Sequence, residues 1–237
     1  MKVALFTDQK HIPELTTMIA QYPTLIPVSE DPDVVISYGG DGTYLRSEYA
    51  WPSIPKVVLK ASTICKLCEP FSNEDILDAL SHNTYVTKEL PLICATAQKK
   101  QLTAVNDIIV HNEDPRHAIR YTIAIDGVPL HEKDIIGDGI VVATPLGSTG
   151  YYRSITDSSF SIGLGLAFNN STEQFDHMVL PEDTVITMTI VRGPALIYAD
   201  NQKEYIVLNE KEHVTIQRSP KKTRLLRMKS HNNHPRL

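Results

Sequence analysis

Cysteine is scarce in this 237-residue chain, and long apolar runs are absent. Cys65, Cys68 and Cys94 are too few for a disulfide framework and are typical of a reducing compartment. No apolar run approaches the roughly 20 residues of a membrane-spanning helix. The N-terminus reads as a short strand and lacks the longer apolar stretch of a signal peptide. We therefore expect a cytoplasmic, soluble protein with no membrane partner.

An excess of positive charge is also absent. The net charge of −5 gives no global basic field that would attract nucleic acid, so we expect no nucleic-acid partner. The basic residues are nevertheless unevenly placed, because no acidic residue follows Glu212. The basic residues beyond it are Arg218, Lys221, Lys222, Arg224, Arg227, Lys229 and Arg236. We interpret them as a solvated last strand and terminus, and a patch for anionic ligands or nucleic acid is the alternative.

Several familiar motifs are missing. The chain has no Gly-x-x-x-x-Gly-Lys-Ser/Thr phosphate loop and no Gly-x-Gly-x-x-Gly after a strand, which excludes two common nucleotide-binding classes. Cys65-x-x-Cys68 has no second cysteine pair and no histidine at zinc spacing. We expect two buried or half-buried thiols there and no protein metal site.

The first hundred residues alternate strand and helix patterns. Strands are expected at residues 2–6, 34–38 and 56–59, and helices at 11–22, 43–51 and 74–81, with Asn73 as the N-cap of the last. This alternation favours an α/β N-terminal domain with a Rossmann-like parallel sheet.

From Tyr85 onward strand patterns dominate. The expected strands are 85–95, 101–111, 118–125, 139–143, 184–191, 196–199, 205–208 and 213–217, and Asp126-Gly127 is typical of a hairpin turn. We expect an all-β, sandwich-like C-terminal domain. The predicted domains are 1–90 and 91–237, with the extreme C-terminus packing back on the first domain.

What the sequence does contain is a concentration of glycine at one strand end. Gly39-Gly40-Asp41-Gly42-Thr43 follows the apolar run at 34–38, and ligands of open α/β sheets bind at the carboxyl ends of strands. Glycines let the backbone approach a phosphate, and the amides at a helix start favour an anion. Asp41 would then lie beside a phosphate as a base or through a magnesium ion. A plain tight turn is the alternative interpretation.

Two later segments carry polar groups at strand ends. Gly137-Asp138-Gly139 precedes an apolar strand, and Thr144 to Tyr151 follows it with hydroxyls, glycines and a tyrosine, as a ligand loop or an ordinary loop would have. Asn106 and Asp107 interrupt an apolar run at 105–110. Burying both requires hydrogen-bond partners, which are either a neighbouring loop or a polar ligand.

In this order, the three segments resemble the NAD kinase family. That family carries Gly-Gly-Asp-Gly-Thr, then an Asn-Glu pair, then Gly-Asp-Gly followed by Thr-Pro-x-Gly-Ser-Thr-Ala-Tyr. The resemblance spans residues 34–200, and its last segment is the most specific. It implies a phosphotransferase that phosphorylates the adenosine-ribose 2′-hydroxyl of NAD with ATP, aided by Mg²⁺ on the ATP phosphates.

The resemblance also implies roles for individual residues. Asp41 matches the general base, and Gly40, Gly42 and Thr43 match the phosphate cradle. The residues matching the dinucleotide site are Asn106, Asp107, Asp138, Thr149, Tyr151 and Ser154. Family members form dimers or tetramers, so a homodimer or homotetramer is expected.

The chain departs from the family pattern at several places. Asp107 stands where the family has Glu, and the family's glycine-containing loop corresponds to the glycine-free residues 58–66. Lys60 and Lys66 either offer positive charge to phosphates there or are ordinary exposed lysines. The donor is left open between ATP and polyphosphate. Two other functions compete: a lipid or sugar kinase sharing the Gly-Gly-Asp-Gly turn, and a non-catalytic dinucleotide-binding homologue.

Overall fold

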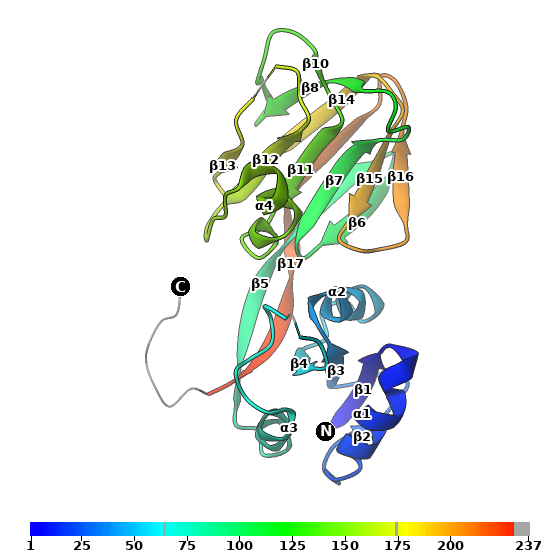
Figure 1. Ribbon diagram of the computed structural model, residues 1–237, viewed down its shortest axis with the longest axis vertical. Helices are drawn as coiled ribbons and strands as arrows, with labels where there is room; N and C mark the ends of the chain where they lie inside the picture. Colours follow the sequence, from blue (N-terminus) through cyan, green and yellow to red (C-terminus); the bar gives the residue numbers. More distant parts are fainter. Residues whose placement is uncertain (64, 174, 230–237) are drawn as a thin grey trace. The chain divides into compact units, whose positions relative to one another are not determined.

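The computed structural model describes residues 1–63, 65–173 and 175–229, and the chain divides into two compact units (Figure 1). Unit 1 holds Met1–Leu90 together with the described residues from Lys222 onward, and unit 2 holds Pro91–Lys221. Two long strands, β5 (Tyr85–Ala97) and β17 (His213–Met228), contribute residues to both units. The extreme C-terminus that was expected to pack back, residues 230–237, lies outside the described residues.

Unit 1 is a parallel sheet with helices, as the alternating patterns predict. Its strands, in spatial order, are β2 (Ile26–Pro27), β1 (Lys2–Thr7), β3 (Val34–Gly39), β4 (Lys56–Lys60) and the end of β17, and all neighbours are parallel. The helical segments are η1 (Gln9–His11), α1 (Ile12–Ile19), α2 (Asp41–Ala50) and α3 (Asn73–Ser81). Every residue of β3 is buried, which explains its apolar run.

Two helix starts differ from the expectation. α3 is capped by Ser72 rather than Asn73. The Ser72 hydroxyl accepts the Asp75 N–H at 3.0 Å, and the Asp75 carboxylate accepts the Ser72 N–H, which completes a capping box. The Asn73 side chain is used elsewhere, since its amide bonds the backbone N–H and carbonyl of Lys60. α2 begins at Asp41, two residues earlier than expected, because the amides of Thr43 and Tyr44 already bond Gly40.

Unit 2 is a β sandwich, which confirms the expected all-β class. One sheet has the antiparallel order β13 (Met178–Leu180), β12 (Leu164–Asn169), β11 (Gly139–Ala143), β7 (Asp107–Asn112), β15 (Ala195–Ala199) and β16 (Tyr205–Leu208). The other contains β10 (Ile135–Gly137), β8 (Ile119–Ile125), β14 (Ile186–Arg192) and the first part of β17. Also in this unit, β9 (Val128–Pro129) pairs with β8, and β6 (Lys100–Ala104) pairs with β5.

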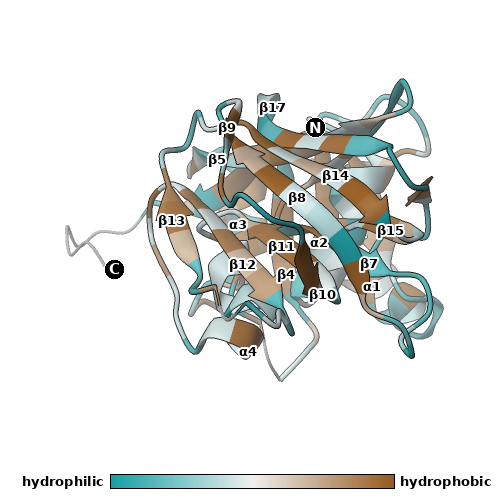
Figure 2. Ribbon diagram, turned by 90° about the horizontal axis from the view of Figure 1, so that it is seen from above, coloured by the Kyte–Doolittle hydropathy of each residue, from teal (hydrophilic) through white to brown (hydrophobic). Residues whose placement is uncertain are grey.

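The core of unit 2 lies between these strands. Side chains of both sheets, such as Val110 and Ile140 from one and Tyr121 and Met188 from the other, form one buried cluster. In Figure 2, brown bands on β8, β11 and β14 mark hydrophobic residues on strands that contribute to this core. Two short helical segments, η2 (Gly147–Thr149) and α4 (Tyr151–Thr156), follow β11.

Individual strand predictions in this unit had mixed outcomes. The Asp126-Gly127 hairpin is confirmed, because both residues have positive φ and Ile125 pairs with Val128. The single strand expected at 101–111 is wrong: it is two strands, β6 and β7, which pair with different partners. The strand expected at 213–217 continues to Met228, and β10, β12 and β13 were not expected. Within the described residues, no helix is long and apolar enough to cross a membrane.

Candidate active site

The glycine turn lies at the carboxyl end of β3, where its sequence position placed it. Gly40 is extended and serves as the N-cap of α2, and its carbonyl accepts the N–H of Thr43 at 3.0 Å. Gly39 tolerates no side chain, because a Cβ there would lie 2.2 Å from Oγ1 of Thr43. The turn therefore brings bare backbone and the start of a ten-residue helix to one sheet edge.

A hollow of about 550 Å³ opens over this turn. Its lining combines the glycine turn with cationic, carboxylate and hydroxyl side chains. The lining residues are Asp8, Lys10, His11, Gly39, Gly40, Asp41, Gly42, Thr43, Arg46, Ala61, Ser62 and Thr63. Arg46 bonds the Asp8 carboxylate at 2.7 Å and lies 3.4 Å from the Thr43 hydroxyl. The hollow thus holds Asp41, the expected base, together with positively charged side chains that would attract phosphate.

The Asp41 carboxylate is held by the loop that follows β4. Both of its oxygens accept the N–H of Lys66 at 3.0 Å, and Oδ1 also accepts the N–H of Leu67 at 2.9 Å. The sulfur of Cys65 lies 3.5 Å from the same Oδ1. Asp41 is half-buried, so its carboxylate is oriented by the loop while it still lines the hollow.

The expectation of two thiols at Cys65-x-x-Cys68 is wrong. Cys65 and Cys68 form a disulfide, and their Cα atoms are 5.4 Å apart. The chain turns back on itself between them, so that the N–H of Cys68 points to the Cys65 sulfur at 3.1 Å. Cys94 is a free, buried thiol.

In unit 2, a second polar cluster surrounds Asn106 and Asp107. Here the start of β7 lies beside the ends of β11 and β15, since Asp107 pairs with Ala143 and Ile108 with Ala199. Asp200 follows β15, and its carboxylate accepts the N–H groups of Val105, Asn106 and Asp107 at 2.8, 2.8 and 3.2 Å. This explains why the chain turns at 105–106 instead of continuing one strand.

Thr144 secures the same turn from the other side. Its hydroxyl donates to the Val105 carbonyl at 2.7 Å, and its N–H donates to the Asn106 carbonyl at 2.8 Å. Gly147 packs against this backbone so closely that a Cβ would lie 2.1 Å from the Asn106 carbonyl oxygen. The segment from Thr144 onward therefore shapes the cluster through backbone contacts.

Asp107 has an unusual protonation equilibrium. Burial, and secondarily the neighbouring carboxylate of Asp200, raises its pKa to about 7. Its carboxyl therefore changes charge near neutral pH. Asp200 was not among the expected site residues; the available signal was a carboxylate directly after the apolar strand expected at 196–199.

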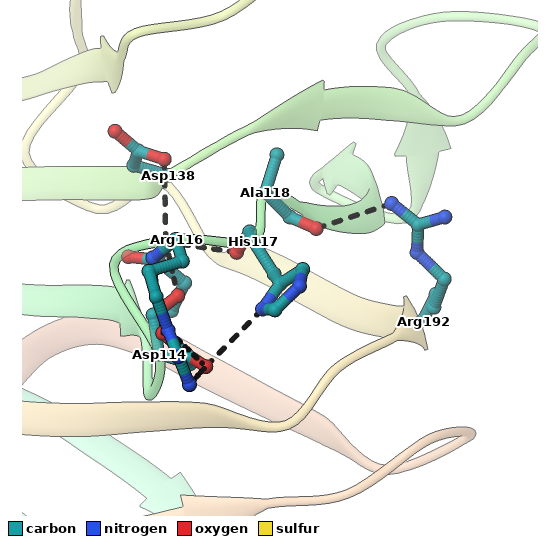
Figure 3. A network of polar contacts seen from close by, with 7 residues as sticks. Asp114, Arg116, His117, Ala118, Asp138 and Arg192 are labelled. Atoms are coloured by element: carbon teal, nitrogen blue, oxygen red, sulfur yellow. Dashed lines mark hydrogen bonds and ion pairs between the residues drawn. The ribbon is translucent and has the colours of Figure 1, made fainter.

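Asp138 lies at the opposite end of β11 from Thr144. About 20 Å of strand separates the two positions. The Asp138 carboxylate accepts the side-chain amides of Asn112 at 3.3 Å and Asn170 at 3.2 Å. Figure 3 shows that it belongs to a network with Asp114, Arg116 and His117, in which the Arg116 guanidinium holds the pKa of Asp114 well below its usual range. Asp138 is thus not part of the Asn106–Asp107 cluster.

The three remaining expected residues lie on η2 and α4, which follow β11. The Tyr151 hydroxyl accepts the side-chain amide of Asn169 at 3.1 Å, and Asn169 pairs with Gly139, so Tyr151 points toward the Asp138 end. Thr149 donates to the Leu146 carbonyl at 3.2 Å. Ser154 is exposed, and its hydroxyl donates a hydrogen bond to the Tyr151 carbonyl of the same helix at 2.7 Å. Lys60 and Lys66 are exposed.

The carboxylates of the hollow indicate which metal ion could bind there. In the described part of the chain, no three His, Cys, Asp or Glu side chains gather closely enough to hold a metal ion. Asp8 and Asp41 are the two carboxylates of the hollow. Two carboxylates fit a magnesium ion that brings phosphate oxygens and water as its other ligands.

Comparison with known proteins agrees with the sequence resemblance. The family model for the ATP-NAD kinase C-terminal domain matches residues 105–228, just over half of the chain. An NAD kinase of Pyrococcus furiosus is 28% identical over 213 residues, which cover 86% of this chain and 76% of that protein.

Two solved structures share the fold. A yeast NADH kinase complexed with NADH matches with a TM-score of 0.82 and 16% identity, covering 98% of this chain and 84% of that one. An NAD kinase from Archaeoglobus fulgidus in complex with ATP matches with a TM-score of 0.75 and 21% identity, covering 95% and 93%. On the match of the family model, the chain belongs to the ATP-NAD kinase family.

Proposed function

We propose that this protein transfers the terminal phosphoryl group of ATP to the 2′-hydroxyl of the adenosine ribose of NAD, giving NADP and ADP. One observation carries the proposal beyond family membership: the carboxylate of Asp41 lines the hollow built by the glycine turn. A carboxylate beside bound phosphate repels it unless the carboxylate serves as a base or binds magnesium, and this supports a chemical role for Asp41 in addition to its hydrogen bonds with the loop.

Asp41 acts as the general base in this proposal. It accepts the proton of the ribose 2′-hydroxyl while the 2′-oxygen bonds to the γ-phosphorus, and the bond from that phosphorus to the ADP oxygen breaks. The amides of Lys66 and Leu67 hold the carboxylate in one orientation. Such positioning matters because phosphoryl transfer depends mainly on alignment and charge neutralisation.

The phosphates of the donor bind over Gly40, Gly42 and Thr43. The helix start offers backbone N–H groups, and Lys10 and Arg46 of the same hollow offer positive charge. Magnesium arriving with ATP would be held by its phosphate oxygens, with Asp8 or Asp41 in reach, and would neutralise phosphate charge.

The dinucleotide is bound by groups of unit 2. Asn106 and Asp107 offer an amide and a carboxyl that titrates near neutral pH, and Asp138, Thr149, Tyr151 and Ser154 complete the proposed set. The Asp138 and Asn106 clusters lie at opposite ends of β11. An extended ligand such as a dinucleotide could use both, whereas a small sugar could not.

The experiment is a product assay with purified protein, magnesium, and each donor and acceptor in turn. ATP and polyphosphate are compared as donors, and NAD, NADH, diacylglycerol and a hexose as acceptors. Formation of NADP from NAD and ATP supports the proposal. Phosphorylation of the lipid or sugar instead of NAD, or measurable NAD binding with no transfer from either donor, would refute it.

The proposal includes self-association into a homodimer or homotetramer, as in the family. Light scattering coupled to size-exclusion chromatography measures this directly. A mass of one 26.5 kDa chain at micromolar concentration would contradict it.

A further inference from the structure

The Cys65–Cys68 disulfide encloses the two residues whose amides hold Asp41. The only residues between the cysteines are Lys66 and Leu67, and these are the donors to the Asp41 carboxylate. Cys65 itself contacts Oδ1 of Asp41 at 3.5 Å. The covalent ring and the proposed base therefore share one set of contacts.

Other parts of unit 1 anchor the C-terminal side of this loop. Arg227 donates to the Leu67 carbonyl at 2.6 Å, and the Met228 N–H bonds the Glu69 carboxylate at 3.1 Å. Both contacts lie at Leu67 or beyond it. Lys66 is exposed, its N–H bonds both Asp41 oxygens, and the disulfide joins the chain on its two sides.

We propose that Cys65 and Cys68 form a reversible dithiol–disulfide modification site that controls the orientation of Asp41. In the oxidised state the closed ring fixes the amides of Lys66 and Leu67 against the carboxylate. In the reduced state the ring opens, the Lys66 amide leaves, and Asp41 loses its fixed orientation. The oxidised protein is therefore the faster enzyme.

The reaction partner is a dithiol, either a small molecule or a reducing protein with two cysteines. One thiolate of the dithiol attacks a sulfur of the pair and breaks the Cys65–Cys68 bond, and its second thiolate then releases the mixed disulfide. Two electrons and two protons pass from the dithiol to the protein, which gains two thiols while the dithiol becomes a disulfide. Both cysteines are half-buried rather than enclosed, so a dithiol can approach.

This inference rests on the proposed function for its kinetic test. The measurement is kcat for NADP formation by the full chain, poised with mixtures of reduced and oxidised dithiothreitol. We expect kcat to fall about tenfold on reduction with the KM for NAD little changed, because misplacing a reacting group by 1 Å can cost about a hundredfold. Equal kcat in both states, a faster reduced enzyme, or cysteines that stay as thiols under oxidising conditions would overturn the inference.

Two variants identify the responsible thiols. The double variant Cys65→Ser with Cys68→Ser should show the low kcat of the reduced protein in every buffer. The matched control is Cys94→Ala, which removes the buried free thiol and should keep the full redox response. A response lost in Cys94→Ala, or kept in the double variant, would assign the effect to another site.

A second readout does not depend on turnover. Amide hydrogen exchange at Lys66 and Leu67, followed by NMR, should be about tenfold faster at Lys66 in the reduced protein, because its hydrogen bonds to Asp41 open more often. Equal exchange in the two states would overturn the inference. If neither state makes NADP, the proposed function fails, and the exchange comparison still decides whether the disulfide holds Asp41.

Discussion

The carboxylate of Asp200 accepts the backbone N–H of Asn106 at 2.8 Å, across 94 residues of sequence. The same carboxylate bonds the amides on either side, and the Asp200 N–H returns a bond to the Asp107 carbonyl at 3.0 Å. One side chain after β15 thus sets the backbone on which two expected dinucleotide-binding residues stand. We therefore infer that Asp200 acts on the proposed dinucleotide site by positioning this backbone.

We predict that Asp200→Asn raises the KM for NAD about tenfold and lowers kcat less, because the new amide nitrogen cannot accept a backbone N–H and a hydrogen bond to a charged group is worth about 1.5–3 kcal/mol. Steady-state kinetics measure this. Asp126→Asn is the matched control, since Asp126 also has positive φ and accepts a backbone N–H, from Val185, at 2.8 Å. An Asp200→Asn effect no larger than that of Asp126→Asn would contradict the assignment.

The raised pKa of Asp107 makes stability depend on pH. The folded protein keeps this proton to about pH 7, whereas the unfolded chain releases it near pH 4. The favourable contribution of the protonated group is therefore complete below about pH 4 and is lost as the pH rises to about 7.

Replacing Asp107 by Asn removes this titration. We predict that Asp107→Asn gains stability relative to the natural protein by on the order of 2–4 kcal/mol between pH 4 and pH 8. Urea unfolding of both proteins at several pH values measures the difference. In an Asp200→Asn background the window should end at a lower pH, because one of the two causes of the shift is removed. Parallel pH profiles for the natural protein and Asp107→Asn would show that Asp107 does not titrate in this range.

Close packing at Gly147 gives a steric prediction. A Cβ at this position would lie 2.1 Å from the Asn106 carbonyl oxygen, which is backbone and cannot swing aside. We expect Gly147→Ala to displace the Asn106 turn and to weaken NAD binding at least about tenfold, since strain of 1–3 kcal/mol is typical of overpacking. Calorimetric titration with NAD measures the affinity.

Gly150→Ala is the comparison for Gly147→Ala. The nearest atom to a Cβ at Gly150 is the Gly147 carbonyl oxygen at 3.2 Å, so a shift of a few tenths of an ångström accommodates it. Its effect on NAD affinity should be clearly smaller. Equal losses in the two variants would mean that the contact with Asn106 is not the cause.

Local patterns in the sequence predicted the features that depend on neighbouring residues. The buried strand before Gly39, the position of the glycine turn at its carboxyl end and the Asp126-Gly127 hairpin follow from apolar runs and from residues that accept positive φ. Errors occurred where a distant group decides the structure. The break at Val105–Asn106 depends on Asp200, and the cap of α3 passes to Ser72 because the Asn73 side chain bonds Lys60.

The site was predictable in its parts but not in its contacts. Asp41 was identifiable from the glycine turn at a strand end, and the Asn106–Asp107 pair because polar groups within an apolar strand need partners. Spacing alone did not reveal that Cys65 and Cys68 are paired, nor that the loop between them holds Asp41. Those contacts depend on how a loop folds back over residues 24 to 26 positions earlier in the chain.

The central claim is that Asp41 is the base of an NAD kinase, and one measurement tests it most directly: NADP formation from NAD and ATP by the natural protein and by Asp41→Asn. Asp33→Asn serves as control, because Asp33 is an exposed carboxylate of the same unit that also accepts a backbone N–H, from Lys2, at 2.7 Å. We predict steady turnover by the natural protein and the control, and a loss of at least about a hundredfold in kcat for Asp41→Asn with NAD affinity nearly unchanged. Full turnover by Asp41→Asn, or no NADP from the natural protein with any donor, would contradict the account.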